Sequence, residues 1–250
     1  MKQLLQMLQE PTVAATGRVE TYLQKPEMGT LPVSCTVTKP TFNLTGVEDL
    51  IRFITLALKT GAGVNVHLDN FPVDSGSQFS NQRQSNIHFH VDDENPDHIK
   101  FEPILSKISY DVPSLIVSDS IKRDGQCWYG RLKHEDNVSI IDAVYQSYLA
   151  GIREDNFLLD LTSLRPEGTK NSKGMVASGP RSFANLFEAA YNFGKHRTLS
   201  NCLSFLSTFN QEIRRGGVYK NGALTTSLPM WHPLAQEYMQ ISPILHPWLH

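Results

Sequence analysis

Hydrophobic and polar positions along the chain follow two periods, one typical of strands and one typical of helices. Residues 31–38 alternate as a strand. The next segment, 46–63, spaces its apolar residues three and four positions apart, which predicts a helix closed by Gly61. Residues 64–68 are predicted to form another short strand. The predicted helix face consists of Val47, Leu50, Ile51, Ile54 and Leu58. This order predicts a βαβ unit with two parallel strands.

A second stretch has the same order. Residues 127–132 are predicted to form a strand, 137–151 a helix ended by Gly151, and 157–161 another strand. The apolar face of this helix consists of Val138, Ile141, Val144, Tyr145 and Tyr148. Each unit runs from a cysteine through a strand, an acidic turn, a helix and a glycine to a strand with aspartate. The order suggests an internal repeat of βα units in one sheet or barrel. The alternative is a chance likeness, because any two βαβ units share this order.

The C-terminal part of the sequence predicts two helices, a strand and a further helix. The helices cover 181–193, after the sequence "SGP", and 198–215, and the strand covers 223–228. The next helix has Pro233 in its first turn. His232 has no acidic neighbour in the sequence, so a packed or helix-opening role is favoured over that of a catalytic base.

The whole chain, residues 1–250, is predicted to form a single α/β domain. One segment within it differs from the rest in its polar composition. Residues 73–111 are predicted to be an insertion or a loop-rich segment, because their first part is rich in Ser, Asn and Gln. The sequence "HFH" at 88–90 is compatible with two alternatives, a metal-binding site and a solvated strand. The strand is favoured because the nearby aspartates follow no known ligand spacing, so we predict no metal site.

Composition and charge narrow the class of protein. The net charge is −2, with 40% hydrophobic and 19% charged residues, which disfavours nucleic-acid and anionic-membrane binders. Apolar runs are too short for a membrane span, and the N-terminal sequence contains glutamines where a signal peptide would be apolar, so we expect a cytoplasmic protein. The three cysteines lack CxxC spacing, and neither a disulfide framework nor a zinc site is predicted.

Three segments, in order, resemble the large catalytic subunit of ribonucleotide reductase. The first is "GTLPVSCTV" with the downstream "KTGAGVNVHLDNF", and the second is "LDLTSLRPEGTKNSKGMVASGPRSFANLFEAA". The third is "RRGGVYKNGALTTSLPMWHPLAQEYMQI". Their order in the chain matches the order in the family. The resemblance implies an α/β fold equivalent to part of the ten-stranded reductase barrel, built from βα units.

The resemblance also implies a redox cysteine on a barrel strand, and two residues compete for that position. The sequence "VSC" favours Cys35, because of the serine before the cysteine. The sequence "CWYG" favours Cys127, because it resembles the corresponding sequence of the B12-dependent monomeric enzymes. A thiol on a barrel strand is shielded from solvent oxidants and held beside the ribose. The alternative for either residue is a buried cysteine that packs as a small hydrophobic side chain.

Other candidate residues follow from the same segments. Substrate contacts are expected from Ser34, Gly61, Ala62 and Gly63, although Gly61 alone would also serve as a helix C-cap and a serine on a strand can bond locally. Deoxynucleotide effector contacts are expected from Arg165, Lys170 and Lys173 in a glycine-rich loop, for which a solvated basic loop is the alternative.

One family feature has no counterpart in the sequence. The family carries its radical-forming cysteine in a finger-loop segment of the form NxCxE, and no such segment occurs here. We therefore expect a reductase fragment or split subunit that a complementary chain must complete, with homo- or hetero-oligomers and nucleotides as partners. An active enzyme would need adenosylcobalamin or a radical-generating partner subunit. The alternatives are a non-catalytic nucleotide-binding, regulatory or structural protein derived from the reductase, and an unrelated α/β protein.

Overall fold

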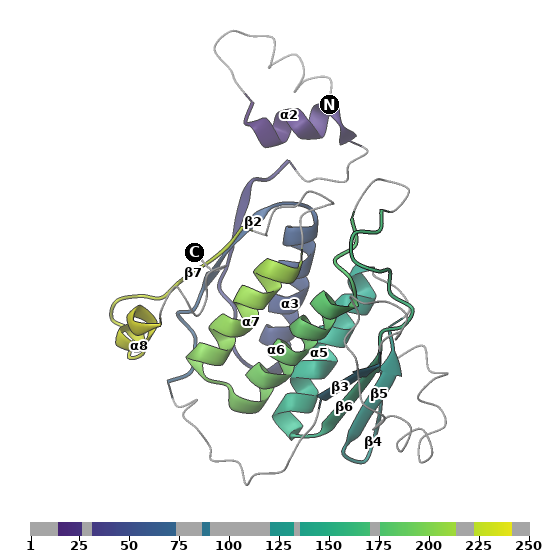
Figure 1. Cartoon of the computed structure of the whole chain (residues 1–250). Coiled ribbons are helices and arrows are strands. Elements are labelled where there is room, and N and C mark those ends of the chain that lie inside the picture. Colours follow the sequence, from purple (N-terminus) through teal and green to yellow (C-terminus); the bar gives the residue numbers. More distant parts are fainter. Residues whose placement is uncertain are drawn as a thin grey trace.

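The first predicted βαβ unit is present. A computed structural model describes residues 15–26, 32–73, 87–90, 121–132, 136–170, 176–213 and 223–241 (Figure 1). Within them, β1 (Cys35–Thr38) pairs in parallel with β2 (Gly63–His67) across α3 (Leu44–Lys59). The Asn43 side chain caps α3 by accepting a hydrogen bond from the Gly46 N–H at 2.8 Å. All five residues of the predicted α3 face are buried, as the 3.6-residue period requires.

A strand from the C-terminal part of the chain completes the first sheet. β7 (Leu224–Ser227) lies parallel to β2, so the sheet order is β1-β2-β7. One face of this sheet is covered by helices, with α3 against β2 and α7 (Leu199–Glu212) against β7. Val64, Val66 and Leu224 are buried on the covered face. Part of the hydrophobic core therefore lies between this sheet and its helices.

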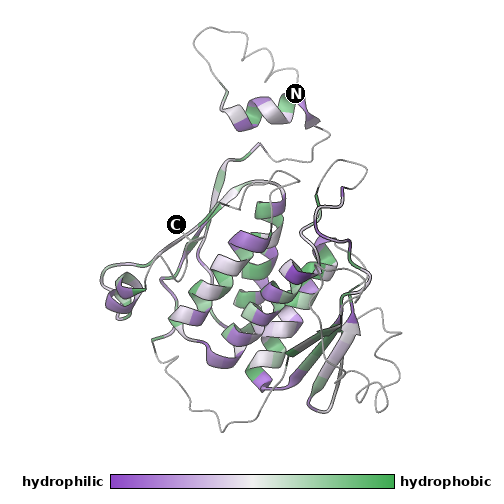
Figure 2. Cartoon of the chain, viewed as in Figure 1, coloured by the Kyte–Doolittle hydropathy of each residue, from purple (hydrophilic) through white to green (hydrophobic). Residues whose placement is uncertain are grey.

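The second predicted unit forms another sheet. β5 (Cys127–Arg131), α5 (Asn137–Arg153) and β6 (Asn156–Asp160) give parallel strands, and β3 (Ile87–His90) lies parallel to β6. β4 (Lys122–Asp124) pairs antiparallel with β5, so the order is β3-β6-β5-β4. The middle of β6 is hydrophobic in Figure 2, in keeping with its burial.

Two separate sheets replace the expected single sheet of successive units. β7 occupies the edge of β2 that the second unit would have used, and the second unit pairs with β3 instead. Mixed α/β architecture with parallel strands is confirmed, while the described residues do not close into a barrel. β3 comes from the predicted insertion, most of which lies outside the described residues, as does Lys173.

Two glycines let α5 and α6 (Pro180–His196) approach closely. A Cβ on Gly151 would lie 2.0 Å from the Tyr191 carbonyl oxygen, and one on Gly194 would lie 2.1 Å from the Tyr148 oxygen. The prediction that Gly151 ends α5 is wrong, because the helix continues to Arg153. Each glycine is instead required by the backbone of the facing helix.

One residue of the predicted α5 face is misplaced. Val138 is 75% exposed, whereas Ile141, Val144 and Tyr148 are buried. Val138 is in the first turn of α5. The start of α6 agrees with the sequence, since Gly179 with φ 84° precedes Pro180 at the first helical position.

Candidate functional site

Among the described elements, the helices α3 and α7 pack on one face of the β1-β2-β7 sheet, and the opposite face carries exposed side chains on β1. Side chains alternate between faces along each strand, and residues in parallel register share a face. Cys35 is in register with Gly63, and Val37 with Asn65 and Thr225. Cys35 is exposed and Val37 is 63% exposed. We call this surface the open face; it consists of Cys35, Val37, Gly63, Asn65, His67, Thr225 and Ser227.

Hydrogen bonds link three polar side chains across the open face. The Asn65 amide nitrogen donates to Thr225 Oγ1 at 2.9 Å, and Ser227 Oγ donates to Asn65 Oδ1 at 3.2 Å. Both ends of the Asn65 amide are therefore fixed by β7. Sequence reasoning missed these residues. In β2 their signal was the alternation of polar Asn65 and His67 with Val64 and Val66, whereas β7 is polar at three consecutive positions and gives no such signal.

Cys35 and two of the predicted substrate residues, Ser34 and Gly63, meet at the amino ends of these strands. The Gly63 N–H donates to the Ser34 carbonyl at 2.7 Å. A Cβ on Gly63 would lie 3.4 Å from Cys35 Sγ and 3.2 Å from the Ala223 carbonyl oxygen. Gly63 thus leaves the space beside the thiol unfilled by a side chain. Of the cysteine candidates, Cys35 is the one that lies on the open face.

Gly61 and Ala62 form the turn that ends α3. Gly61 has φ 81°, and the Ala62 N–H donates to the Ala57 carbonyl at 2.9 Å. Arg18 of α2 (Gly17–Gln24) donates to the Gly61 carbonyl. The Ala62 side chain is 1% exposed and belongs to the core rather than to the open face. The helix-capping role of Gly61 is therefore present in the structure.

The other two cysteines lie away from Cys35. Cys127 is half-buried at the start of β5, beside the β4–β5 turn at the lower end of Figure 1, whereas β1 begins near the upper end. Cys202 is buried in α7, and burial raises the pKa of its thiol, so it stays protonated. Among the described cysteines, none forms a pair with Cys35.

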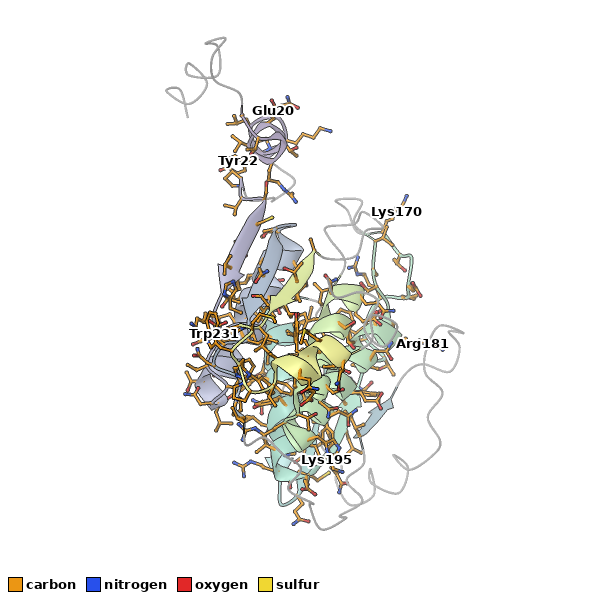
Figure 3. The ribbon with its side chains drawn as sticks, turned by 90° about the vertical axis from the view of Figure 1, so that its left-hand side faces the viewer. Glu20, Tyr22, Lys170, Arg181, Lys195 and Trp231 are labelled. Carbon is orange, nitrogen blue, oxygen red and sulfur yellow. The ribbon has the colours of Figure 1, made fainter. Side chains whose placement is uncertain are left out.

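The predicted effector loop follows β6 and has a paired stem. The Gly168 N–H donates to the Ala177 carbonyl at 3.1 Å, and Lys170 forms an antiparallel bridge with Val176. Lys170 is exposed and projects from the outer part of the loop in Figure 3. Arg165 is half-buried nearer β6. The two described basic residues therefore have different environments.

A buried ion pair supports the base of this loop. Arg131 Nε lies 2.7 Å from Asp160 Oδ2, and the Thr162 N–H and hydroxyl both donate to Asp160 Oδ1. Asp160 is 4% exposed. Ligands of open parallel sheets bind beyond the carboxyl ends of the strands, which is the position of this loop.

The segment after β7 exposes large apolar side chains. Trp231 is 87% exposed and Met230 74%, and Figure 3 shows Trp231 on the other side of the molecule from Lys170. His232 contacts the Phe71 carbonyl through Nε2 at 3.1 Å and accepts from the Leu234 N–H through Nδ1. His232 therefore packs in the turn before α8 (Ala235–Gln240), whereas the prediction that Pro233 is in the first turn of this helix is wrong, because the helix begins at Ala235.

The fold is similar to that of a known enzyme. The crystal structure of a B12-dependent (class II) ribonucleotide reductase matches 83% of this chain at 16% sequence identity, with a TM-score of 0.50. The match covers 30% of that enzyme's chain, so this chain corresponds to a minor part of its length. No family model and no curated protein matches the sequence. None of the described helices has both the length and the apolar character that crossing a bilayer requires.

Proposed function

We propose that this chain is part of a ribonucleotide reductase large subunit, completed by a second polypeptide that carries the finger-loop cysteine. The chain would contribute Cys35 as a redox thiol, the Ser34 and Gly63 backbone beside it, and the loop bearing Lys170. The fold similarity over 83% of the chain supports this function, as do the three sequence segments in family order.

The open face is the observation that carries the proposal. Parallel sheets in folded proteins are covered on both faces, and here one face exposes Cys35 and Val37 beside a part-buried polar network. Trp231 and Met230 are exposed beyond the end of β7. A second set of barrel strands would cover these surfaces and would enclose Cys35 in a site shielded from water.

The chemistry requires a second thiol. Reduction of the ribose takes two electrons from two thiols, which lose their hydrogens and are left joined as a disulfide. Cys35 would supply one of these thiols. Cys127 is in the other sheet and Cys202 is buried in α7, so the second thiol would come from the complementary chain.

Reconstitution tests the proposal. The chain is co-expressed with the product of the neighbouring gene, and reduction of ribonucleoside di- and triphosphates is measured with adenosylcobalamin and, separately, with a radical-generating subunit. We expect Cys35→Ser to abolish turnover and Cys127→Ser to retain it. Absence of both complex and turnover would rule the proposal out.

A non-catalytic nucleotide-binding module is the second candidate. It is favoured by the absence of a thiol partner for Cys35 among the described cysteines. A module of this kind would be stabilised by deoxynucleoside triphosphates through mass action. We expect Lys170→Ala to reduce the rise in Tm. If turnover is absent but this rise is present, the second candidate replaces the first.

A further inference from the structure

The two edges of the β1-β2-β7 sheet are protected differently. Along β7, backbone groups that bind β2 alternate with groups that point outward, and side chains from α7 and α8 bind two of the outward groups. The Leu224 N–H donates to Asn210 Oδ1 at 3.0 Å, and the Tyr238 hydroxyl donates to the Thr226 carbonyl at 3.0 Å. The β7 edge is therefore partly closed by the chain's own helices.

The β1 edge has no such protection among the described residues. The Gly63 N–H donates to the Ser34 carbonyl at 2.7 Å, so every second residue of β1 binds β2 in the parallel ladder. The N–H and C=O groups of Cys35 and Val37 therefore point away from β2, and none of the described strands pairs with β1 on that side. Both side chains are exposed. An open strand edge is a template for a strand from another chain.

The sequence around β1 is nearly symmetrical about Thr36. It reads "PVSCTVTKP" from 32 to 40, with a proline at each end and a hydroxyl residue two positions to each side of Thr36. Antiparallel pairing of two copies about Thr36 places Cys35 opposite Val37 of the second copy. It likewise places Ser34 opposite Thr38. Because proline cannot donate to a ladder, the pairing ends at equal distances from its centre, which favours a second copy over an unrelated strand.

We propose that two copies of this chain associate through their β1 edges, antiparallel about a two-fold axis at Thr36. Each Cys35 then exchanges both backbone hydrogen bonds with Val37 of the other copy, and the two sheets join into one. Lys39 is no obstacle, because its ammonium group lies 2.7 Å from the Asp69 carboxylate. This pairing goes beyond the proposed function and does not depend on it, since no complementary chain takes part.

Sedimentation of the whole chain over a range of concentrations tests the association. Two short strands bury little surface, so we expect a reversible dimer with a Kd of about 10–100 µM. Val37→Pro removes an outward N–H and leaves the ladder to β2 intact, and it should weaken the dimer at least about tenfold. The matched control is Val37→Ala, which keeps the N–H and should weaken the dimer no more than about threefold.

Disulfide trapping tests the register of the two strands. Thr36 lies opposite Thr36 of the second copy as a non-hydrogen-bonded pair, whose Cα atoms are about 4.5 Å apart and within disulfide range. In a Cys35→Ser background, Thr36→Cys should therefore form an intermolecular disulfide on mild oxidation. Thr38→Cys, which lies opposite Ser34, should not. The remaining native cysteines are present in both variants and contribute equally.

Several results would overturn the proposal. A monomer at every concentration would do so and would leave the β1 edge to a strand of a different protein. A dimer that Val37→Pro leaves unchanged would place the contact elsewhere on the molecule. Equal trapping of Thr36→Cys and Thr38→Cys would exclude the register centred on Thr36. If Val37→Pro does not fold, the two trapping variants decide.

Discussion

The two βαβ units have the same order of elements but very different surroundings. In the first unit, every residue of β1 is exposed or half-buried, whereas in the second unit four of the five residues of β6 are buried. Among the described elements, helices pack on one face of the first sheet, and the open face exposes Cys35 and Val37. A local pattern of strand, helix and strand therefore specifies the unit, while the neighbouring segments decide which of its faces are covered.

Both units also join the carboxyl ends of their strands by an ion pair. Lys39 lies 2.7 Å from Asp69 after β1 and β2, and Arg131 lies 2.7 Å from Asp160 at the ends of β5 and β6. The side-chain exposures are 54% and 25% in the first pair, but 23% and 4% in the second. The same interaction is therefore a surface feature in one unit and an interior feature in the other.

The largest expected difference between the units is in side-chain packing. Phe157 on β6 is fully buried, so Phe157→Ala should lower the free energy of unfolding by about 4 kcal/mol. Val37→Ala on the open face should change it by less than about 0.5 kcal/mol. Urea denaturation measures both. A large loss from Val37→Ala in the isolated chain would show that the open face is already covered.

The glycines of the two units give the next largest effect. Gly151→Ala places a methyl group against the Tyr191 carbonyl and should cost about 3 kcal/mol by forcing α5 away from α6. Gly61→Ala should cost about 1 kcal/mol, because φ 81° is unfavourable for alanine. Gly17→Ala is the control, since no atom lies within 4 Å of the added Cβ. Equal effects at Gly151 and Gly17 would contradict the close helix approach.

The role of Gly151 shows what local sequence can and cannot predict. The buried face of α3 and the parallel pairing of β1 with β2 follow from spacing alone, and both are confirmed. Gly151 looked like a helix end because glycine commonly ends helices. Its actual requirement comes from Tyr191 on another helix, and no spacing within α5 contains that information.

The candidate site likewise combines residues that the sequence predicts with residues that only tertiary contacts bring together. Ser34, Cys35 and Gly63 were singled out from their segments, and parallel pairing brings them together. Asn65 and Thr225 could not be connected in advance, because β7 reaches β2 only through tertiary pairing over 160 residues of chain. A contact of that length is decided by the competition among strands for the edge of β2.

The two ion pairs should differ in energy. Arg131→Met leaves the buried Asp160 without its cation and should cost about 2 kcal/mol. Lys39→Met should have a much smaller effect at neutral pH, because this pair is exposed. The hydrogen bond from Lys39 lowers the pKa of Asp69, so its small stabilisation exists above the ordinary carboxyl pKa and is lost as the pH falls. Denaturation at pH 7 and pH 3 checks both, and a larger loss from Lys39→Met would reverse the comparison.

Thiol reactivity distinguishes the two units without any substitution, because Cys35 is the first residue of β1 and Cys127 is the first residue of β5. Cys35 is exposed, Cys127 is half-buried and Cys202 is buried with a raised pKa, so a maleimide should label Cys35 at least about tenfold faster than Cys202, with Cys127 between them. Peptide mass spectrometry of the wild-type chain measures all three rates. Addition of a complementary chain that covers the open face should slow Cys35 and leave Cys127 unchanged. Equal slowing of both thiols would place the partner elsewhere, because Cys127 lies in the other sheet.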